Sequence, residues 1–238
     1  ELALLTPGNY DIIDRAIIDE ERGWYYFYAS PEDATQKYLY RVPLDGSGTM
    51  QRISPADQPG THGYNFSPDA QWAVHTYSTL NVPPIHELIE VDTHRVISLL
   101  EDNHAIRERM KSFSCSPAEF LKLDIGNGLF FDAWMLKPQD FDASKKYPVF
   151  IYVYGEPHAQ TVLDEWGTSQ IDFHRVVAEM GYVVVSIDNR GTPCPKGAAW
   201  RRAIFGSLGP LSTEEQEAGL KAMARQCSFI DLDRVGIW

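Results

Sequence analysis

The segment Tyr147-Pro148-Val149-Phe150-Ile151-Tyr152-Val153-Tyr154-Gly155 decides the fold class of this chain. Its continuous apolar run is typical of a strand that is buried on both faces of a parallel sheet, and Gly155 ends it. Apolar residues at helical spacing follow and predict a helix from about residue 169 to 180. Residues 182–187 then repeat the buried-strand pattern. Strands that alternate with helices predict an α/β domain with a doubly wound, mostly parallel sheet.

Further elements of the same domain lie on both sides of this strand. Residues 119–124 and 129–136 predict two strands across the turn Gly126-Asn127-Gly128. Downstream, Ser212-Thr213-Glu214-Glu215 matches a capping box, which predicts a helix from there to about residue 226. Residues 234–238 begin one more strand.

The first hundred residues have a different sequence pattern, which is typical of short strands separated by turns. Strands are predicted at 24–29, 37–42 and 50–53, and a looser copy begins at Trp72, about 48 residues after Trp24. The copy contains strands at 72–77, 86–91 and 95–100. A period of about 40–50 residues with several strands per unit indicates β-propeller blades, which bury their faces against neighbouring blades. A small β-sandwich is the alternative.

Composition excludes several classes of protein. Among 238 residues, 44% are hydrophobic and 23% charged, close to the average for soluble globular domains. The net charge of −12 would repel a phosphate backbone, so we expect no nucleic-acid partner. No apolar run approaches the length of a membrane span, and the N-terminus lacks the pattern of a signal peptide, which leaves the localisation unknown. The chain has three cysteines, Cys115, Cys194 and Cys227, which lack the spacing of a zinc site. One disulfide between two of them stays an open alternative.

A nucleophile is not found in the chain. No Gly-x-Ser-x-Gly is present, and Gly206-Ser207-Leu208-Gly209 is interpreted as a polar loop because its spacing is wrong. No phosphate-binding glycine loop occurs, and the seven histidines show no metal-binding spacing. In α/β-hydrolases the nucleophile sits on a tight turn directly after a buried central strand. That turn would follow Trp238.

Three segments carry a family resemblance. Residues 147–158 resemble the V-Y-G-G-P-H segment of the prolyl oligopeptidase superfamily, and 188–192 resemble its D-x-R-G-[ST] turn. Residues 230–238 resemble the approach to its G-W-S-G-G-G elbow. The dipeptidyl peptidase IV branch fits best, because 99–103 resemble the segment by which its members pass from propeller to hydrolase domain.

The resemblance implies a serine exopeptidase that releases N-terminal dipeptides, preferentially after proline, from peptides with a free N-terminus. The reaction would be acyl transfer by a Ser-His-Asp triad without a cofactor or metal. The triad residues would all follow Trp238, so the chain itself is expected to be inactive. Tyr154 would donate its hydroxyl to the oxyanion. A homodimer stays open for the full-length protein.

Glu156 departs from the family pattern, which has glycine at this place. Because glutamate does not tolerate positive φ as glycine does, we expect the turn behind Tyr154 to differ or to be strained. A carboxylate here would oppose negative charge on an oxyanion, so Glu156 either points outward to a cation or forms part of a pocket for the substrate amino group. Arg190 is expected to shape its own turn through an ion pair or hydrogen bonds.

We therefore expect residues 1–105 to be the last blades of a propeller and 106–238 to be the N-terminal half of an α/β-hydrolase catalytic domain, cut before the nucleophile elbow. Two alternatives stay open. One is another peptidase of the superfamily, an oligopeptidase or acylaminoacyl peptidase. The other is a non-catalytic binding protein that keeps the propeller and hydrolase folds.

Overall fold

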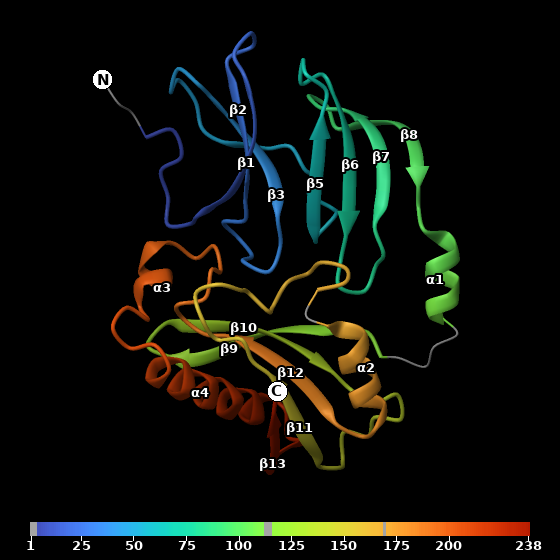
Figure 1. The fold of residues 1–238 in the computed structure, drawn as a ribbon, viewed down its shortest axis with the longest axis vertical. Coiled ribbons are helices and arrows are strands. Elements are labelled where there is room, and N and C mark those ends of the chain that lie inside the picture. Colours follow the sequence, from blue (N-terminus) through green and yellow to red (C-terminus); the bar gives the residue numbers. More distant parts are fainter. Residues whose placement is uncertain (1–3, 112–115, 169) are drawn as a thin grey trace. The chain divides into compact units, whose positions relative to one another are not determined.

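The structure is a computed structural model that describes residues 4–111, 116–168 and 170–238. The chain forms two compact units. Unit 1 comprises residues 1–107, 164–166 and 195–198, and unit 2 comprises 108–163, 167–194 and 199–238. The described residues contain three sheets, which Figure 1 shows with their helices. None of the helices within these ranges is long and apolar enough to cross a membrane.

Unit 1 contains two four-stranded antiparallel sheets, and each is a meander of consecutive strands. The first sheet has the order β1-β2-β3-β4 and the second has the order β5-β6-β7-β8. Their bounds are Ile12–Asp19, Trp24–Ala29, Tyr38–Pro43 and Gln51–Arg52 for β1 to β4, and Thr61–Phe66, Trp72–Ser78, Ile85–Glu90 and Arg95–Glu101 for β5 to β8. The predicted strands are therefore confirmed with small shifts of their ends. The first strand of each sheet, β1 and β5, was missed.

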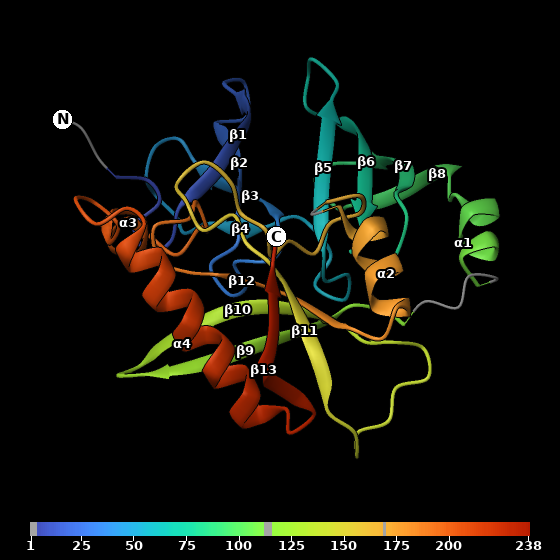
Figure 2. The same ribbon diagram turned by 60° about the horizontal axis from the view of Figure 1, so that its bottom comes forward.

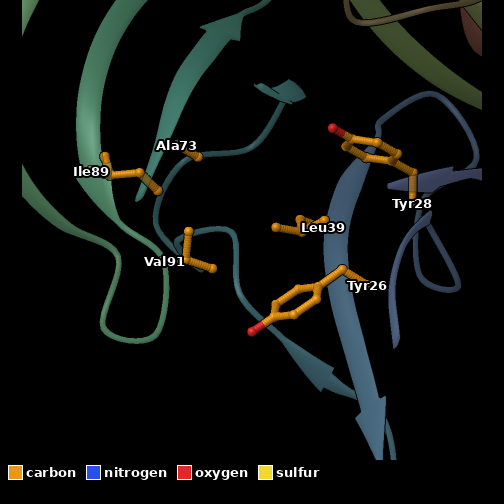
Figure 3. Packing of buried hydrophobic residues seen from close by; sticks show 6 residues of the cluster. All are labelled: Tyr26, Tyr28, Leu39, Ala73, Ile89 and Val91. Carbon is orange, nitrogen blue, oxygen red and sulfur yellow. The ribbon is translucent and has the colours of Figure 1, made fainter. Parts of the chain in front are cut away.

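The two sheets of unit 1 share a hydrophobic core (Figure 3). The first sheet contributes aromatic rings from β2 and a leucine from β3, and the second contributes small aliphatic side chains from β6, β7 and the turn after β7. These residues are Tyr26, Tyr28, Leu39, Ala73, Ile89 and Val91. Strand β2, the aromatic strand of the first repeat, is thus half of an internal interface between the two sheets, which explains its strong pattern in the sequence.

A short segment from the second half of the chain also belongs to unit 1. The backbone N–H of Asp164 donates to the carbonyl of Thr35 (2.7 Å), and its carboxylate accepts from the N–H of Leu80 (2.9 Å). Burial raises the pKa of Asp164. These bonds satisfy backbone groups in turns that no sheet ladder reaches.

Unit 2 is built on a five-stranded mixed sheet with the order β13-β11-β12-β10-β9. The bounds are Glu119–Gly126 for β9, Leu129–Leu136 for β10, Tyr147–Tyr152 for β11, Val183–Asp188 for β12 and Ile230–Ile237 for β13. Strands β11, β12 and β13 are parallel, whereas the β9–β10 hairpin pairs with β12 in the antiparallel sense. The predicted hairpin is confirmed: Asn127 and Gly128 both have positive φ (54° and 75°), as a tight two-residue turn requires.

Two helices cover opposite faces of this sheet (Figure 2). Helix α2, Ile171–Glu179, packs His174 against Trp134 and Tyr152 on one face. Helix α4, Pro210–Gln226, places Gly219 against Phe131 and Ile187, whose side chains point to the other face. Two shorter helices, α1 (His104–Lys111) and α3 (Ala198–Arg202), complete the helices of the described residues. Ser169, the predicted start of α2, lies outside the described residues.

The predicted capping box is wrong. Helix α4 begins at Pro210, two residues before Ser212, and Gly209 precedes it without any side-chain cap. Proline is favoured at the first helical position because its fixed φ suits the helix and its missing N–H needs no partner there. Ser212 and Glu215 consequently lie inside the helix, where their side chains make other bonds.

The cysteines form no bridge within the part of the chain that the structure describes. Cys194 is buried and Cys227 is half-buried, and neither forms a disulfide with another described residue. Cys115 lies outside the described residues.

Candidate active site

The carboxyl ends of the three parallel strands meet at one edge of the sheet of unit 2. Strand β11 leads to Tyr154, β12 ends at Asp188, and β13 leads to Trp238. The ladder between β11 and β13 continues beyond the strands, because Val153 N–H donates to the Trp238 carbonyl and Trp238 N–H donates to the Ile151 carbonyl (both 3.0 Å). Ligands of open α/β sheets bind at this edge.

Tyr154 presents its side chain at this edge. It lies two residues beyond the end of β11, and its side chain is 38% exposed. Its ring lies 6.4 Å from that of His158, and its hydroxyl makes no hydrogen bond to any other described residue. A phenol hydroxyl in this state can donate to an incoming oxygen atom.

Gly155 makes the turn behind Tyr154. Its φ of +70° is a conformation that side-chain-bearing residues rarely adopt, and a Cβ would lie only 3.2 Å from Asn189 Oδ1. The Gly155 carbonyl accepts two hydrogen bonds, from Ser212 Oγ (2.7 Å) and from Asn189 Nδ2 (3.1 Å). The turn is thus bonded to α4 and to the loop after β12.

Glu156 does not have the strained backbone that the sequence led us to expect. Only five non-glycine residues of the described chain have positive φ, and Glu156 is not among them. The strained alternative was wrong because Gly155, one residue earlier, provides the positive φ that the turn needs. The Glu156 side chain is exposed and forms no ion pair with the described residues.

The loop after β12 is held by a dense set of hydrogen bonds. Gln216 Nε2 donates to Asn189 Oδ1 (2.8 Å) and to the Ile187 carbonyl (2.7 Å). The Glu215 carboxylate accepts from the backbone N–H of Arg190 (2.9 Å) and from its Nε (2.6 Å). The prediction that Arg190 shapes its own turn is therefore confirmed.

Asp188 ties a second loop to the same edge. Its carboxylate is 1% exposed and accepts from the N–H and hydroxyl of Thr161 (3.0 and 2.9 Å) and from the N–H of Val162 (2.9 Å). Burial raises the pKa of Asp188, and the bonds from Thr161 and Val162 oppose that shift. The chain that follows Tyr154 thus returns to the end of β12 and is fixed there.

The structure brings Tyr154 and Glu156 onto one loop but also adds residues that sequence reasoning missed. Ser212, Asn189 and Gln216 converge on the turn behind Tyr154. The signal for Ser212 was present but was assigned to a helix cap. For Asn189 and Gln216 no local pattern could have indicated the contact, because it joins residues 27 positions apart.

The chain is similar to two known protein families and to several of their members. Residues 2–84 match the family model described as the dipeptidyl peptidase IV N-terminal region, and 170–238 match the prolyl oligopeptidase family. The curated relative "Probable dipeptidyl-aminopeptidase B" of Aspergillus clavatus is 35% identical over 99% of this chain and 25% of its own length. A relative of the same name from Emericella nidulans is 31% identical over 100% of this chain and 26% of its own length.

Two solved structures have a similar fold. Dipeptidyl peptidase 4 of Porphyromonas gingivalis matches with a TM-score of 0.87 and 31% identity, over 98% of this chain and 32% of that chain. A Bacteroides ovatus structure has the same fold, with a TM-score of 0.81 at 23% identity over 98% of this chain and 32% of that chain. This chain spans about a quarter of the length of the curated relatives it matches. With propeller-blade sheets followed by an α/β-hydrolase sheet, the chain belongs to the dipeptidyl peptidase IV branch of the prolyl oligopeptidase superfamily.

Proposed function

We propose that this chain is part of a serine-type dipeptidyl peptidase that releases N-terminal dipeptides, preferentially after proline, from peptides with a free N-terminus. The names of the relatives support the class of activity. The observation that carries the proposal is the partly exposed side chain of Tyr154, held on a fixed turn at the carboxyl edge of the parallel strands. A Ser-His-Asp triad from residues beyond Trp238 would perform the acyl transfer.

Tyr154 would act as one donor of the oxyanion hole. As the nucleophile attacks the scissile carbonyl, negative charge develops on the carbonyl oxygen, and a preorganised O–H donor stabilises that charge more than it stabilises the ground state. Removal of one such donor typically costs about 3–4 kcal/mol of transition-state stabilisation, which is a loss of about 10²–10³ in kcat.

Glu156 is the weaker part of this proposal. Its exposed carboxylate, which forms no ion pair with the described residues, would attract the charged amino group of a substrate. Glu156→Gln would then raise KM for substrates with a free N-terminus and leave kcat close to that of the unmodified enzyme. An unchanged KM would remove Glu156 from the binding site.

The test uses the full-length enzyme with a Gly-Pro chromogenic substrate. Tyr154→Phe is expected to lower kcat by about 10²–10³ with little change in KM, because the bond forms only in the transition state. Tyr152→Phe is the matched control, since Tyr152 is the last residue of β11, two positions before Tyr154, and packs its ring against His174. Equal kcat for the two variants would refute the role of Tyr154.

Two further measurements separate the alternatives. The isolated 238-residue chain should not hydrolyse the substrate, and robust turnover would contradict the placement of the triad beyond Trp238. A full-length protein that binds proline-containing peptides without any turnover would favour the non-catalytic alternative. Cleavage of blocked or internal peptide bonds would favour an oligopeptidase.

A further inference from the structure

We infer that Ser212 and Asn189 are positioning residues for Tyr154, acting through the Gly155 carbonyl. The inference rests on the proposed role of Tyr154 as an oxyanion donor. Because Ser212 lies on helix α4, the inference gives this helix a role in holding the proposed oxyanion donor in place.

The first step concerns the freedom of the turn. Glycine loses more conformational freedom on ordering than any other residue, so a glycine directly after a catalytic side chain would leave that side chain loosely placed. Gly155 is buried, and its carbonyl oxygen accepts one bond from each of two elements, α4 and the loop after β12. A carbonyl oxygen has two lone pairs, so both of its acceptor sites are used.

The second step concerns the other side of Tyr154. The N–H of Val153 donates to the Trp238 carbonyl (3.0 Å), which extends the sheet ladder to the residue before Tyr154. Tyr154 is therefore bracketed by a fixed peptide group on each side. The sheet holds the first group, and Ser212 with Asn189 holds the second.

The third step concerns the face of α4 that supplies these bonds. Ser212, Glu215 and Gln216 occupy positions i, i+3 and i+4 and so lie on one face of the helix. Their side chains bond to Gly155, Arg190 and Asn189, respectively. One helix face therefore fixes both turns at this edge, and Gln216 holds the Asn189 amide so that its Nδ2 points to Gly155.

The experiment compares two serine variants of the full-length enzyme with the Gly-Pro chromogenic substrate. A catalytic group displaced by about 1 Å can cost about 10²-fold in rate. Because Asn189 still holds the turn, Ser212→Ala is expected to lower kcat by about 10-fold with KM unchanged. Ser207→Ala is the control, since Ser207 is half-buried and lies in the loop just before the same helix. Ser212→Thr, which keeps the hydroxyl, should restore most of the activity.

A double-mutant comparison shows whether Ser212 acts through Tyr154. In a Tyr154→Phe background the hydroxyl to be positioned is gone, so adding Ser212→Ala should change kcat by less than about 2-fold. A further 10-fold loss in that background, or a kcat for Ser212→Ala equal to that of Ser207→Ala, would overturn the inference. Thermal melting of each variant shows that the fold is retained.

Failure of the inference can be told apart from failure of the proposed function. If Tyr154→Phe lowers kcat but Ser212→Ala does not, only the positioning role is wrong. If Tyr154→Phe leaves kcat unchanged, the oxyanion role itself is wrong. A ¹⁹F signal from fluorotyrosine at residue 154 then tests whether Ser212 positions this ring. Broadening or splitting of the signal in Ser212→Ala but not in Ser207→Ala supports the positioning role, and identical signals in the two variants refute it.

Discussion

Gly191, in the turn after β12, is the residue at which one added methyl group should disturb unit 2 most. Its φ is +94°, and a Cβ built on it would lie 2.5 Å from Ile204 Cβ and 2.8 Å from both Cγ2 and Cδ1. The nearest contact is the branch point of a buried side chain (6% exposed), which cannot move without its backbone. Gly191→Ala therefore combines a strained φ with a steric overlap.

The two contributions can be estimated separately. A non-glycine residue in the left-handed region costs about 1–2 kcal/mol. Overpacking of a filled core site costs about 1–3 kcal/mol, and the fixed position of the Ile204 Cβ places this case in the upper part of that range. We expect Gly191→Ala to lower the free energy of unfolding by about 3–5 kcal/mol.

The matched control is Gly206→Ala, because Gly206 also has positive φ (+76°) but no atom lies within 4 Å of its added Cβ. It should lose only the backbone part, about 1–2 kcal/mol. Urea unfolding of the 238-residue chain at pH 7, followed by tryptophan fluorescence, gives both values, and equal m-values would show that the unfolded states are comparable. If Gly191→Ala destabilises the chain no more than Gly206→Ala does, the steric reasoning is refuted.

Three further predictions concern buried polar groups. Burial lowers the pKa of His62 to about 4, so as the pH falls from about 6.5 to 4 the unfolded chain binds a proton that the folded chain does not, and the free energy of unfolding falls by about 3 kcal/mol. Urea unfolding at a series of pH values should show a smaller fall of this free energy for His62→Gln. An equal fall in both proteins would contradict the prediction. Asp188→Asn replaces one carboxylate oxygen with an amide N–H₂, which then faces the backbone N–H donor of Thr161 or of Val162, and should cost about 2–3 kcal/mol in the same assay; a neutral change would refute the network. Glu215→Gln weakens the pair with half-exposed Arg190 and should cost about 1–2 kcal/mol, whereas exposed Glu214→Gln should cost less than about 0.5 kcal/mol; equal effects would contradict it.

The strands that the sequence revealed are those with a strong local pattern. Strand β2 is almost entirely aromatic, and β12 is a run of buried aliphatic residues, so both were predicted within one residue of their observed ends. Strand β1 contains three charged residues and is mostly exposed, and β5 contains Gly63, which lowers strand propensity. Their pairing with β2 and β6, not their own composition, makes them strands.

The site could be predicted only as far as one local motif reached. The motif around Tyr154 places that residue after a buried strand, and the strand order places it at the edge where ligands bind. The motif did not show which residue carries the positive φ. Glycine at 155 meets that requirement, so the backbone tolerates glutamate at 156.

The misassigned capping box shows why the remaining site residues were out of reach. Ser212 and Glu215 fit the local rule for a helix start, and a local rule cannot register that Pro210 has already begun the helix. Once inside the helix, Ser212 is one turn from Gln216, and this spacing aims both side chains at the ends of β11 and β12. Which groups they meet depends on the parallel order of those strands, a long-range property. The serine that local chemistry assigned to a cap is therefore free to hold the turn on which Tyr154 depends.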